Sequence, residues 1–212
     1  MKIVFSNKQK DIASKNDLRT FCTNIGLDPQ NLITVNQIHS SSIISTELPG
    51  NYDCYDGILN FGGKLVCAIK VADCLPIYFV NNASKTLGLL HAGWRGLSLG
   101  IIKKYLNKIG EEVDGHLSTY AFIGPSIQSC CFRVKEDVIN HFDSDFYSKI
   151  NDNHFQVDLQ KWALNQILDS KIKVENTFIS KNCTYCNKSK YHSFRRDGRN
   201  AGRMYAMIGW EE

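Results

Sequence analysis

Short apolar segments, rich in β-branched and aromatic side chains, recur along this chain and stop at glycine, asparagine or proline. Segments of this kind are typical of buried strands bounded by turns. They predict strands at residues 2–6, 32–38, 42–48, 55–61, 64–72, 74–81, 86–93, 118–125, 174–180 and 203–210. Because these strands follow one another in groups, we expect an α+β fold with mixed β-sheets flanked by helices. A chain of 212 residues can bury one substantial core, which predicts a single domain over residues 1–212.

Apolar residues spaced three and four positions apart predict where the helices lie. The predicted helices cover residues 16–27, 97–110, 135–142 and 158–170. Asp158 is expected to cap the last helix, because its side chain can accept a hydrogen bond from the first turn. Cys22 and Cys67 lie in apolar segments, so we expect both thiols to pack in the core.

Hydropathy and charge narrow the class of protein. No apolar run approaches the roughly 18 residues that a membrane span needs, and the apolar stretch near Met1 is too short for a signal peptide. We therefore expect a cytoplasmic protein with no membrane contact and with reduced cysteines. The net charge is +4, and much of the excess comes from Lys181, Lys188, Lys190, Arg195, Arg196, Arg199 and Arg203. This cluster suits a nucleic-acid surface, a small-anion site or a solvated rim, and composition alone favours the rim.

Three potential metal ligands occur where an apolar strand meets a break in the pattern. They are His39 in NQIHS, Cys74 in VADCLP and His91 in HAGWRG. Two imidazoles and one thiolate, with a fourth position left open, are a donor set that catalytic zinc uses. We expect these three side chains to converge on one site. Alternate residues share a strand face, so Gln37 is expected beside His39.

Two segments supply groups that suit an anion. In HAGWRG, Arg95 carries a planar cation, and the helix expected after Gly93 exposes unpaired N–H groups. In YHSFRRDGRNAGR, Arg195 and Arg196 point in opposite directions if the chain is extended, so one of them can reach a site.

The pair Cys183 and Cys186 has two possible roles. A single CxxC motif is half of a structural zinc site or a redox pair. Cys130 and Cys131 are adjacent in the chain, and adjacent cysteines seldom both bind one tetrahedral ion. We therefore do not expect them to complete a zinc site with the CxxC pair.

Taken together, these motifs resemble the YfiH-like laccase-domain proteins, which are also catalogued as polyphenol oxidases and as purine nucleoside phosphorylases. The resemblance rests on NQIHS, YDGIL, VADCLP, HAGWRG, IGPSIQSCCFRV, VDLQKWALNQI and the late CTYC…YHSFRRDGRNAGR, in this order. It runs from about residue 33 to the C-terminus. One departure is Cys131, which stands where many relatives have tyrosine.

The resemblance implies a zinc site made of His39, Cys74 and His91. It also implies phosphorolysis of adenosine, inosine and methylthioadenosine, with adenosine deamination as a side activity. The expected partners are therefore small-molecule purine nucleosides and phosphate, and we expect a monomer or weak homodimer. The family fold is similar to a bacterial toxin domain with a Cys-His hydrolytic pair, and some members are named as cell-wall editing factors.

The choice of metal can be argued from histidine usage. A multicopper centre needs many histidines in His-x-His pairs, whereas this chain has six histidines and no such pair. A blue-copper site combines two His and one Cys with a weak axial Met, but Cys74 and His91 are far apart in the chain for such a loop. We therefore expect zinc rather than copper, although the family label keeps a copper-dependent polyphenol oxidase as an alternative.

Roles for the surrounding residues follow from the implied chemistry. Zinc-assisted deamination needs a proton shuttle, and Asp73 is the nearest carboxylate in the sequence. Phosphorolysis needs cations that hold phosphate, and a flat side chain can stack on the purine base. The phosphate-binding candidates are Arg95, Arg195 and Arg196, and the stacking candidates are Trp94 and Phe194.

Two other interpretations use the same residues differently. In a metal-free cysteine hydrolase, Cys74 is the nucleophile, and His91 or His39 is its base. In a non-enzymatic protein, the basic C-terminal segment binds nucleic acid or another partner. The last interpretation leaves the histidines and Cys74 unexplained, so nucleic acid is not the partner that we expect.

Overall fold

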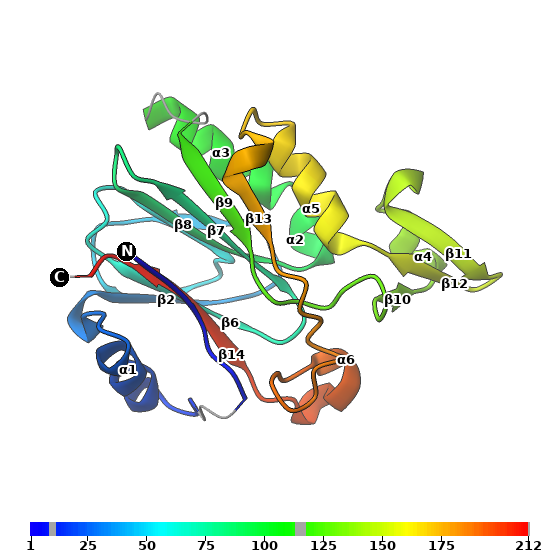
Figure 1. Ribbon diagram of the computed structural model, residues 1–212, viewed down its shortest axis with the longest axis horizontal. Helices are drawn as coiled ribbons and strands as arrows, with labels where there is room; N and C mark the ends of the chain where they lie inside the picture. The colour runs from blue at the N-terminus through cyan, green and yellow to red at the C-terminus, as the bar shows by residue number, and fades with distance from the viewer. Residues whose placement is uncertain (9–11, 113–117, 212) are drawn as a thin grey trace.

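The computed structural model describes residues 1–8, 12–112 and 118–211. Two mixed β-sheets lie face to face, and helices cover the outer face of each (Figure 1). The mixed sheets and flanking helices predicted from the sequence are thus confirmed, while the predicted likeness to a toxin domain stays a prediction. Within the described residues, no helix combines the length and the apolar character needed to cross a lipid bilayer.

The first sheet joins the two ends of the chain. Its strands, in spatial order, are β1 (Lys2–Phe5), β14 (Met204–Gly209), β6 (Val66–Val71), β2 (Leu32–Asn36) and β4 (Gly50–Asp53). β14 runs antiparallel to both β1 and β6, whereas β2 runs parallel to both β6 and β4. β2 and β6 therefore point the same way, so the segments that follow them leave the sheet at the same edge.

The second sheet contains several strands that are buried along their whole length. In spatial order they are β13 (Thr177–Ile179), β9 (Thr119–Ile123), β7 (Leu75–Asn81), β8 (Thr86–Ala92), β5 (Gly57–Asn60) and β3 (Ile43–Ser45). Every residue of β7 and β8 is buried, because one face meets the first sheet and the other meets helices. This two-sided burial explains why these strands read as continuous apolar runs.

Helices pack outside both sheets. They are α1 (Lys15–Asn24), α2 (Trp94–Ser98), α3 (Ile101–Glu112), α4 (Glu136–Ile139), α5 (Leu159–Leu168) and α6 (Phe194–Asp197), with 3₁₀ turns η1 (Pro29–Asn31), η2 (Ser144–Phe146), η3 (Val174–Asn176) and η4 (Gly198–Asn200). Figure 1 shows α2, α3 and α5 on the second sheet and α1 on the first. The Asp158 side chain accepts a hydrogen bond from the backbone N–H of Lys161, which confirms it as the cap of α5.

Three apolar layers hold this sandwich together. One lies between the two sheets and contains Cys67, the next lies between the second sheet and its helices, and the third lies under α1 and contains Cys22. Both thiols are fully buried, as predicted. Tyr105 of α3 stacks on Phe79 of β7, with ring centroids 4.5 Å apart, and fills the space left by the missing side chain of Gly88.

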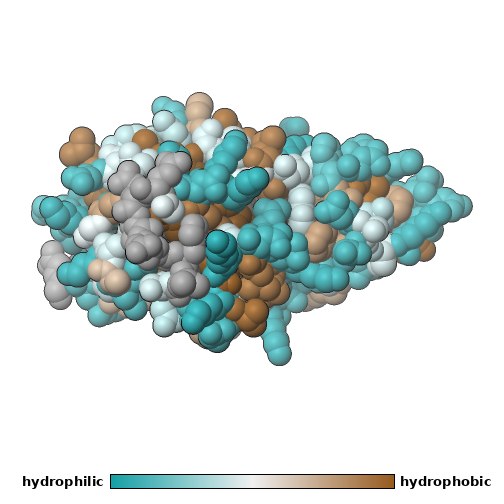
Figure 2. All heavy atoms as spheres, turned by 90° about the horizontal axis from the view of Figure 1, so that it is seen from above, coloured by the Kyte–Doolittle hydropathy of each residue, from teal (hydrophilic) through white to brown (hydrophobic). Residues whose placement is uncertain are grey.

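A small third sheet projects from the sandwich. It consists of β10 (Arg133–Val134), β12 (His154–Val157) and β11 (Tyr147–Asn151). With α4 it forms the narrow end of the molecule in Figure 1, and polar side chains dominate that end in Figure 2. These strands were not predicted from the sequence because they are short and largely polar.

Several predicted element boundaries are wrong. The strand predicted at 42–48 covers only Ile43–Ser45, and the helix predicted at 135–142 covers only Glu136–Ile139. The helix predicted at 97–110 begins earlier and is broken between α2 and α3 at Gly100, which has a φ of 72°. That left-handed conformation suits glycine and ends a helix.

Candidate metal centre and active site

The structure brings His39, Cys74 and His91 together. Cys74 immediately precedes β7, and the antiparallel register pairs Pro76 with His91 on β8. One nitrogen or sulfur atom from each of the three side chains lies within 4.8 Å of the others. The two imidazole rings meet edge to face, with centroids 4.9 Å apart. One strand and two connecting segments thus bring three side chains to one point.

His39 reaches this point from a turn rather than from a strand, which corrects the sequence-based expectation. β2 ends at Asn36, and His39 has a φ of 60°, so Gln37 and His39 do not share a strand face. Gln37 instead donates from its side chain to the Lys70 carbonyl at 2.7 Å and accepts from the Lys70 N–H at 3.0 Å. Its side chain therefore extends the pairing between β2 and β6 and anchors the His39 turn.

Asp56 is the residue that sequence reasoning missed. Its side chain is fully buried, and it accepts hydrogen bonds from the backbone N–H groups of Ile38, His39 and Ser40 and from the Ser40 hydroxyl. It also bonds to Nδ1 of His91 at 2.8 Å. One carboxylate therefore holds both histidines. The only sequence signal was an acidic residue at the start of an apolar strand, in YDGIL.

His91, Cys74 and Asp56 stabilise one another in their charged forms. Burial alone would lower the pKa of His91, but the Cys74 thiolate and the Asp56 carboxylate raise it to about 9. Burial alone would raise the pKa of Cys74, but His91 and a hydrogen bond with His39 lower it to about 6. Burial likewise opposes ionisation of Asp56, yet bonds from His91 and Ser40 lower its pKa to about 2.

This donor set fits a zinc ion. Cys74 supplies a thiolate near neutral pH, and thiolate and imidazole are zinc ligands. His91 turns Nδ1 to Asp56, which leaves its other ring nitrogen for the ligand position, as in the carboxylate–histidine–metal arrangement. The absence of a side chain at Gly93 leaves room for Cys74, because a Cβ there would lie 2.9 Å from the Cys74 sulfur.

A cavity of about 930 Å³ is lined by His39, Cys74 and His91. Its size is within the range of small-molecule sites. Of the predicted residues, Gln37, Asp73, Trp94, Arg95, Phe194 and Arg195 line it. Sequence reasoning did not assign to the site four further cations that line the cavity, namely Lys70, Arg133, Lys135 and Arg203. The cations outnumber the acidic lining residues, Asp73 and Asp137, so the cavity favours an anion.

Arg196 is not among the residues that line the cavity. Its guanidinium donates to the carbonyls of Thr184, Tyr185 and Tyr191 and pairs with Asp197 at 2.8 Å. The two arginines lie on α6 rather than on an extended chain. Arg195 faces the cavity, while Arg196 holds the loop in place.

Asp73 is both a lining residue and an anchor. It is buried, with a φ of 87°. One carboxylate oxygen accepts from the Thr184 hydroxyl at 2.6 Å, and the other accepts from the Ser193 hydroxyl at 3.0 Å and the Arg195 N–H at 2.6 Å. Asp73 therefore fixes the loop that presents Arg195, and its predicted part in proton transfer stays a prediction.

The two predicted stacking residues differ in exposure. Phe194 is 50% exposed at the cavity, and the Arg203 guanidinium carbon lies 5.9 Å from its ring centroid. Trp94 is partly buried and already contacts two neighbours: the Arg95 guanidinium lies 4.3 Å from its ring centroid, and the His141 ring lies 5.2 Å away. Phe194 therefore has the freer aromatic surface.

The fold and site define a laccase-type domain. Residues 4–211 match the family described as multi-copper polyphenol oxidoreductase laccase, so the protein belongs to this family. The match confirms the family that the motifs predicted.

Relatives within the family are named for a more specific activity. A purine nucleoside phosphorylase, YlmD, of Geobacillus stearothermophilus is 29% identical over 196 residues, covering 88% of this chain and 70% of the relative. A purine nucleoside phosphorylase of Haemophilus influenzae is 30% identical over 192 residues, covering 86% and 76%. The crystal structure of Bacillus licheniformis YfiH superposes with a TM-score of 0.87 at 25% identity, covering 92% of this chain and 80% of that chain.

Proposed function

We propose that this protein is a purine nucleoside phosphorylase that uses adenosine, inosine or methylthioadenosine as its substrate. The observation that carries the proposal is the single cavity that joins a three-residue metal-binding group to a surplus of cations. Phosphorolysis needs a phosphate dianion beside a neutral nucleoside, and this cavity combines positive charge with aromatic surface. The names of the relatives support the same activity.

Phosphate binding is assigned to the arginines of the cavity. Arg95, Arg133 and Arg195 come from three separate segments, and guanidinium groups bind phosphate oxygens with charge-assisted hydrogen bonds. Asp73 holds the backbone of Arg195, and Arg195 donates to the Arg133 carbonyl at 2.5 Å. Arg195 is therefore held in place before substrate arrives, which would reduce the entropy lost on binding.

Base binding is assigned to Phe194, whose exposed ring offers a stacking surface. In the reaction, a phosphate oxygen forms a bond to C1′ of the ribose while the bond from C1′ to the purine nitrogen breaks. The base leaves with that electron pair and takes up a proton. The cations hold the phosphate in line with C1′, and Phe194 holds the leaving base.

A zinc ion bound by His39, Cys74 and His91 would supply Lewis-acid charge at the floor of the cavity. Asp56 orients His91 and the His39 turn toward that position. Cys74 contributes a thiolate that is already ionised near neutral pH. The same low pKa favours the second candidate function, a metal-free cysteine hydrolase. There the thiolate would form a bond to the substrate while the bond to the leaving group breaks and His91 protonates that group, and water would then release the product from the sulfur.

Incubation with inosine and with adenosine, with and without inorganic phosphate, tests the proposal when the products are identified. We expect phosphate-dependent release of hypoxanthine and adenine together with ribose 1-phosphate. Inosine formed from adenosine without phosphate would indicate deamination instead. No reaction with any nucleoside would refute the proposal, and oxidation of a phenolic substrate would support the polyphenol oxidase alternative.

Metal dependence separates the two candidate mechanisms. We expect activity to fall when a strong chelator removes the metal and to return with added zinc. Full activity in protein whose metal analysis is negative would refute the zinc mechanism and favour the cysteine hydrolase.

A further inference from the structure

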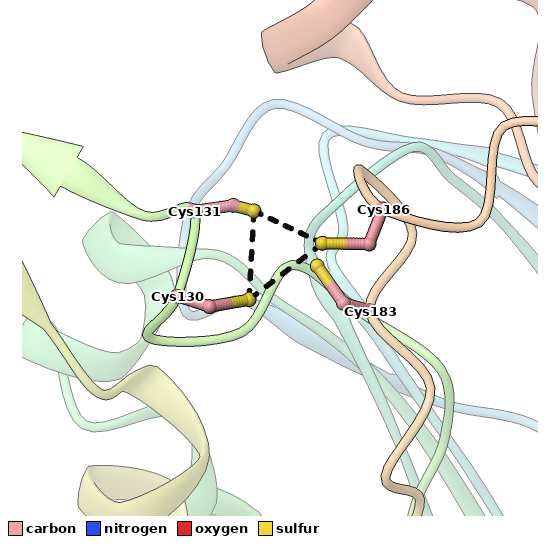
Figure 3. A group of neighbouring side chains, drawn as sticks. All are labelled: Cys130, Cys131, Cys183 and Cys186. Carbon is pink, nitrogen blue, oxygen red and sulfur yellow. Dashed lines mark hydrogen bonds between the residues drawn. The ribbon is translucent and has the colours of Figure 1, made fainter.

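A second cysteine cluster lies outside the active site. Cys130 and Cys131 lie in the turn between β9 and β10, whereas Cys183 and Cys186 lie in the loop between β13 and α6. Figure 3 shows the four side chains pointing toward one another. The four sulfur atoms all lie within 4.8 Å of one another. We did not expect Cys130 and Cys131 to lie with the CxxC pair, because they are adjacent in the chain. The structure contradicts this expectation, since it places all four sulfur atoms together.

The sulfur separations are those of metal ligands rather than of a disulfide. They are 3.5 Å for Cys130 and Cys131, 3.8 Å for Cys130 and Cys186, and 3.3 Å for Cys131 and Cys186. A disulfide would bring two sulfurs to about 2.0 Å, and all four cysteines are free. Zinc–sulfur bonds of about 2.3 Å in a tetrahedron place their sulfurs about 3.8 Å apart. Modest rearrangement would therefore accommodate one ion.

Backbone hydrogen bonds hold the two loops in this arrangement. Ser126 forms an isolated bridge with Cys183, and the Thr184 N–H donates to the Ser126 carbonyl at 3.0 Å. The Cys131 N–H donates to the Gln128 carbonyl at 2.9 Å. The Asn187 N–H closes the turn around the CxxC pair by donating to the Cys183 carbonyl at 3.1 Å. The thiols therefore converge without relying on their own mutual contacts.

We propose that Cys130, Cys131, Cys183 and Cys186 bind a structural zinc ion, distinct from the metal of the active site. Four thiolates complete a tetrahedral zinc site and leave no position for substrate, which makes the role structural rather than catalytic. Soft thiolate ligands select zinc or iron over magnesium and calcium.

The position of the ion explains what it stabilises. The turn with Cys130 and Cys131 leads into Phe132 and Arg133, which line the active-site cavity. The loop with Cys183 and Cys186 leads to α6, which presents Phe194 and Arg195 to the same cavity. Zinc would join the two segments and so hold one wall of the cavity.

The test counts metal in protein whose active-site ligands are removed. A His39→Ala/Cys74→Ala variant, purified under reducing conditions without added metal, is expected to retain about one zinc per chain by elemental mass spectrometry. Exchange with cobalt is expected to give the strong visible and near-ultraviolet absorption of tetrahedral cobalt thiolate. The result does not depend on catalytic activity, so it stands or falls separately from the proposed function.

Two cysteine variants complete the experiment. Adding Cys183→Ser and Cys186→Ser to that background is expected to abolish zinc retention and the cobalt spectrum. Cys54→Ser removes an exposed thiol outside both clusters and is expected to change neither. If the double serine variant does not fold, Cys130→His tests the site instead, because histidine also binds zinc and the ion should be retained. Absence of metal, bound iron in place of zinc, or a mass showing a disulfide among the four cysteines would overturn the proposal.

Discussion

Asp56 connects the turn that carries His39 to the strand that carries His91. It accepts from the turn that carries His39 and bonds to His91 on β8. A buried carboxylate with this many donors stays ionised, which is why its pKa falls to about 2. Asp56 therefore contributes both to the turn geometry and to the charge of the site.

Asp56→Asn is expected to lower the free energy of unfolding of the metal-free protein by about 2–4 kcal/mol at pH 7, because it replaces an ionised acceptor that has several donors. The folded pKa of Asp56 lies below its unfolded value. Its contribution is therefore present above pH 4 and lost as the pH falls toward 2. Urea unfolding at pH 7 and pH 3 measures this, and the difference between wild type and variant should shrink at the lower pH. Asp152→Asn, on an exposed ion pair with Lys149, is the control and should change little.

Cys74 should react as a thiolate in the metal-free protein. Because its pKa is lowered to about 6, we expect the rate of alkylation by iodoacetamide to rise with pH around 6 rather than around 9. Mass spectrometry of the Cys74 peptide measures the rate separately from the other thiols. Added zinc should protect the residue, and a midpoint near that of an ordinary thiol would contradict the assignment.

Ligand chemistry in the sequence was enough to predict that His39, Cys74 and His91 would converge, because imidazole and thiol groups at breaks in the apolar pattern suit one metal site. It was not enough to predict Asp56. An acidic residue beside a strand is common, and only the folded chain shows that three N–H groups and an imidazole meet it.

At the scale of elements, α6 directs two adjacent arginines to different partners, so they have different roles. Arg195 lines the cavity, while Arg196 satisfies three carbonyls of its own loop. The sequence predicted that only one of them would reach a site. It could not say which, because the answer depends on a short helix whose first N–H groups are held by Asp73 and Ser193.

Arg195→Ala and Arg196→Ala form a matched pair. We expect Arg195→Ala to raise the KM for phosphate about tenfold or more, the loss of one charge-assisted contact, with a small change in melting temperature. Arg196→Ala should instead destabilise the fold by about 2–4 kcal/mol, because buried carbonyls lose their donor. Phosphate titration and thermal unfolding of both variants distinguish the roles, and an unchanged phosphate KM in Arg195→Ala would contradict the phosphate assignment.

At the scale of the whole molecule, the strand order is what brings distant segments together. Parallel pairing of β13 with β9 sets the CxxC loop beside the turn that carries Cys130 and Cys131. Local patterns predicted most of the buried strands, since both faces of β7 and β8 are apolar. Strand order could not be predicted from those patterns, because it depends on which faces fit together after the chain has collapsed.

β1 and β14 come from opposite ends of the chain and pair at one edge of the first sheet. Deleting residues 1–6 is expected to destabilise the protein strongly and to promote aggregation, because the edge of β14 becomes exposed. Thermal unfolding and light scattering measure both effects. Lys2→Ala is the control: it removes an ion pair with Glu211 and a hydrogen bond to the Ile25 carbonyl but keeps the strand, so its effect should be much smaller than that of the deletion. A truncated protein as stable as wild type would show that β1 is dispensable.

Gln37 allows the chain to leave β2 without disturbing the hydrogen bonds of β6. A primary amide carries the same donor and acceptor as a peptide group, so the side chain of Gln37 serves Lys70 as a mimic of the next peptide. The backbone is thereby released from sheet geometry one residue after β2, without leaving an unpaired group on β6. The residues that follow can therefore turn toward Asp56 while the ladder stays intact. Glutamate, although nearly the same size, lacks the donor and could not substitute for the missing peptide.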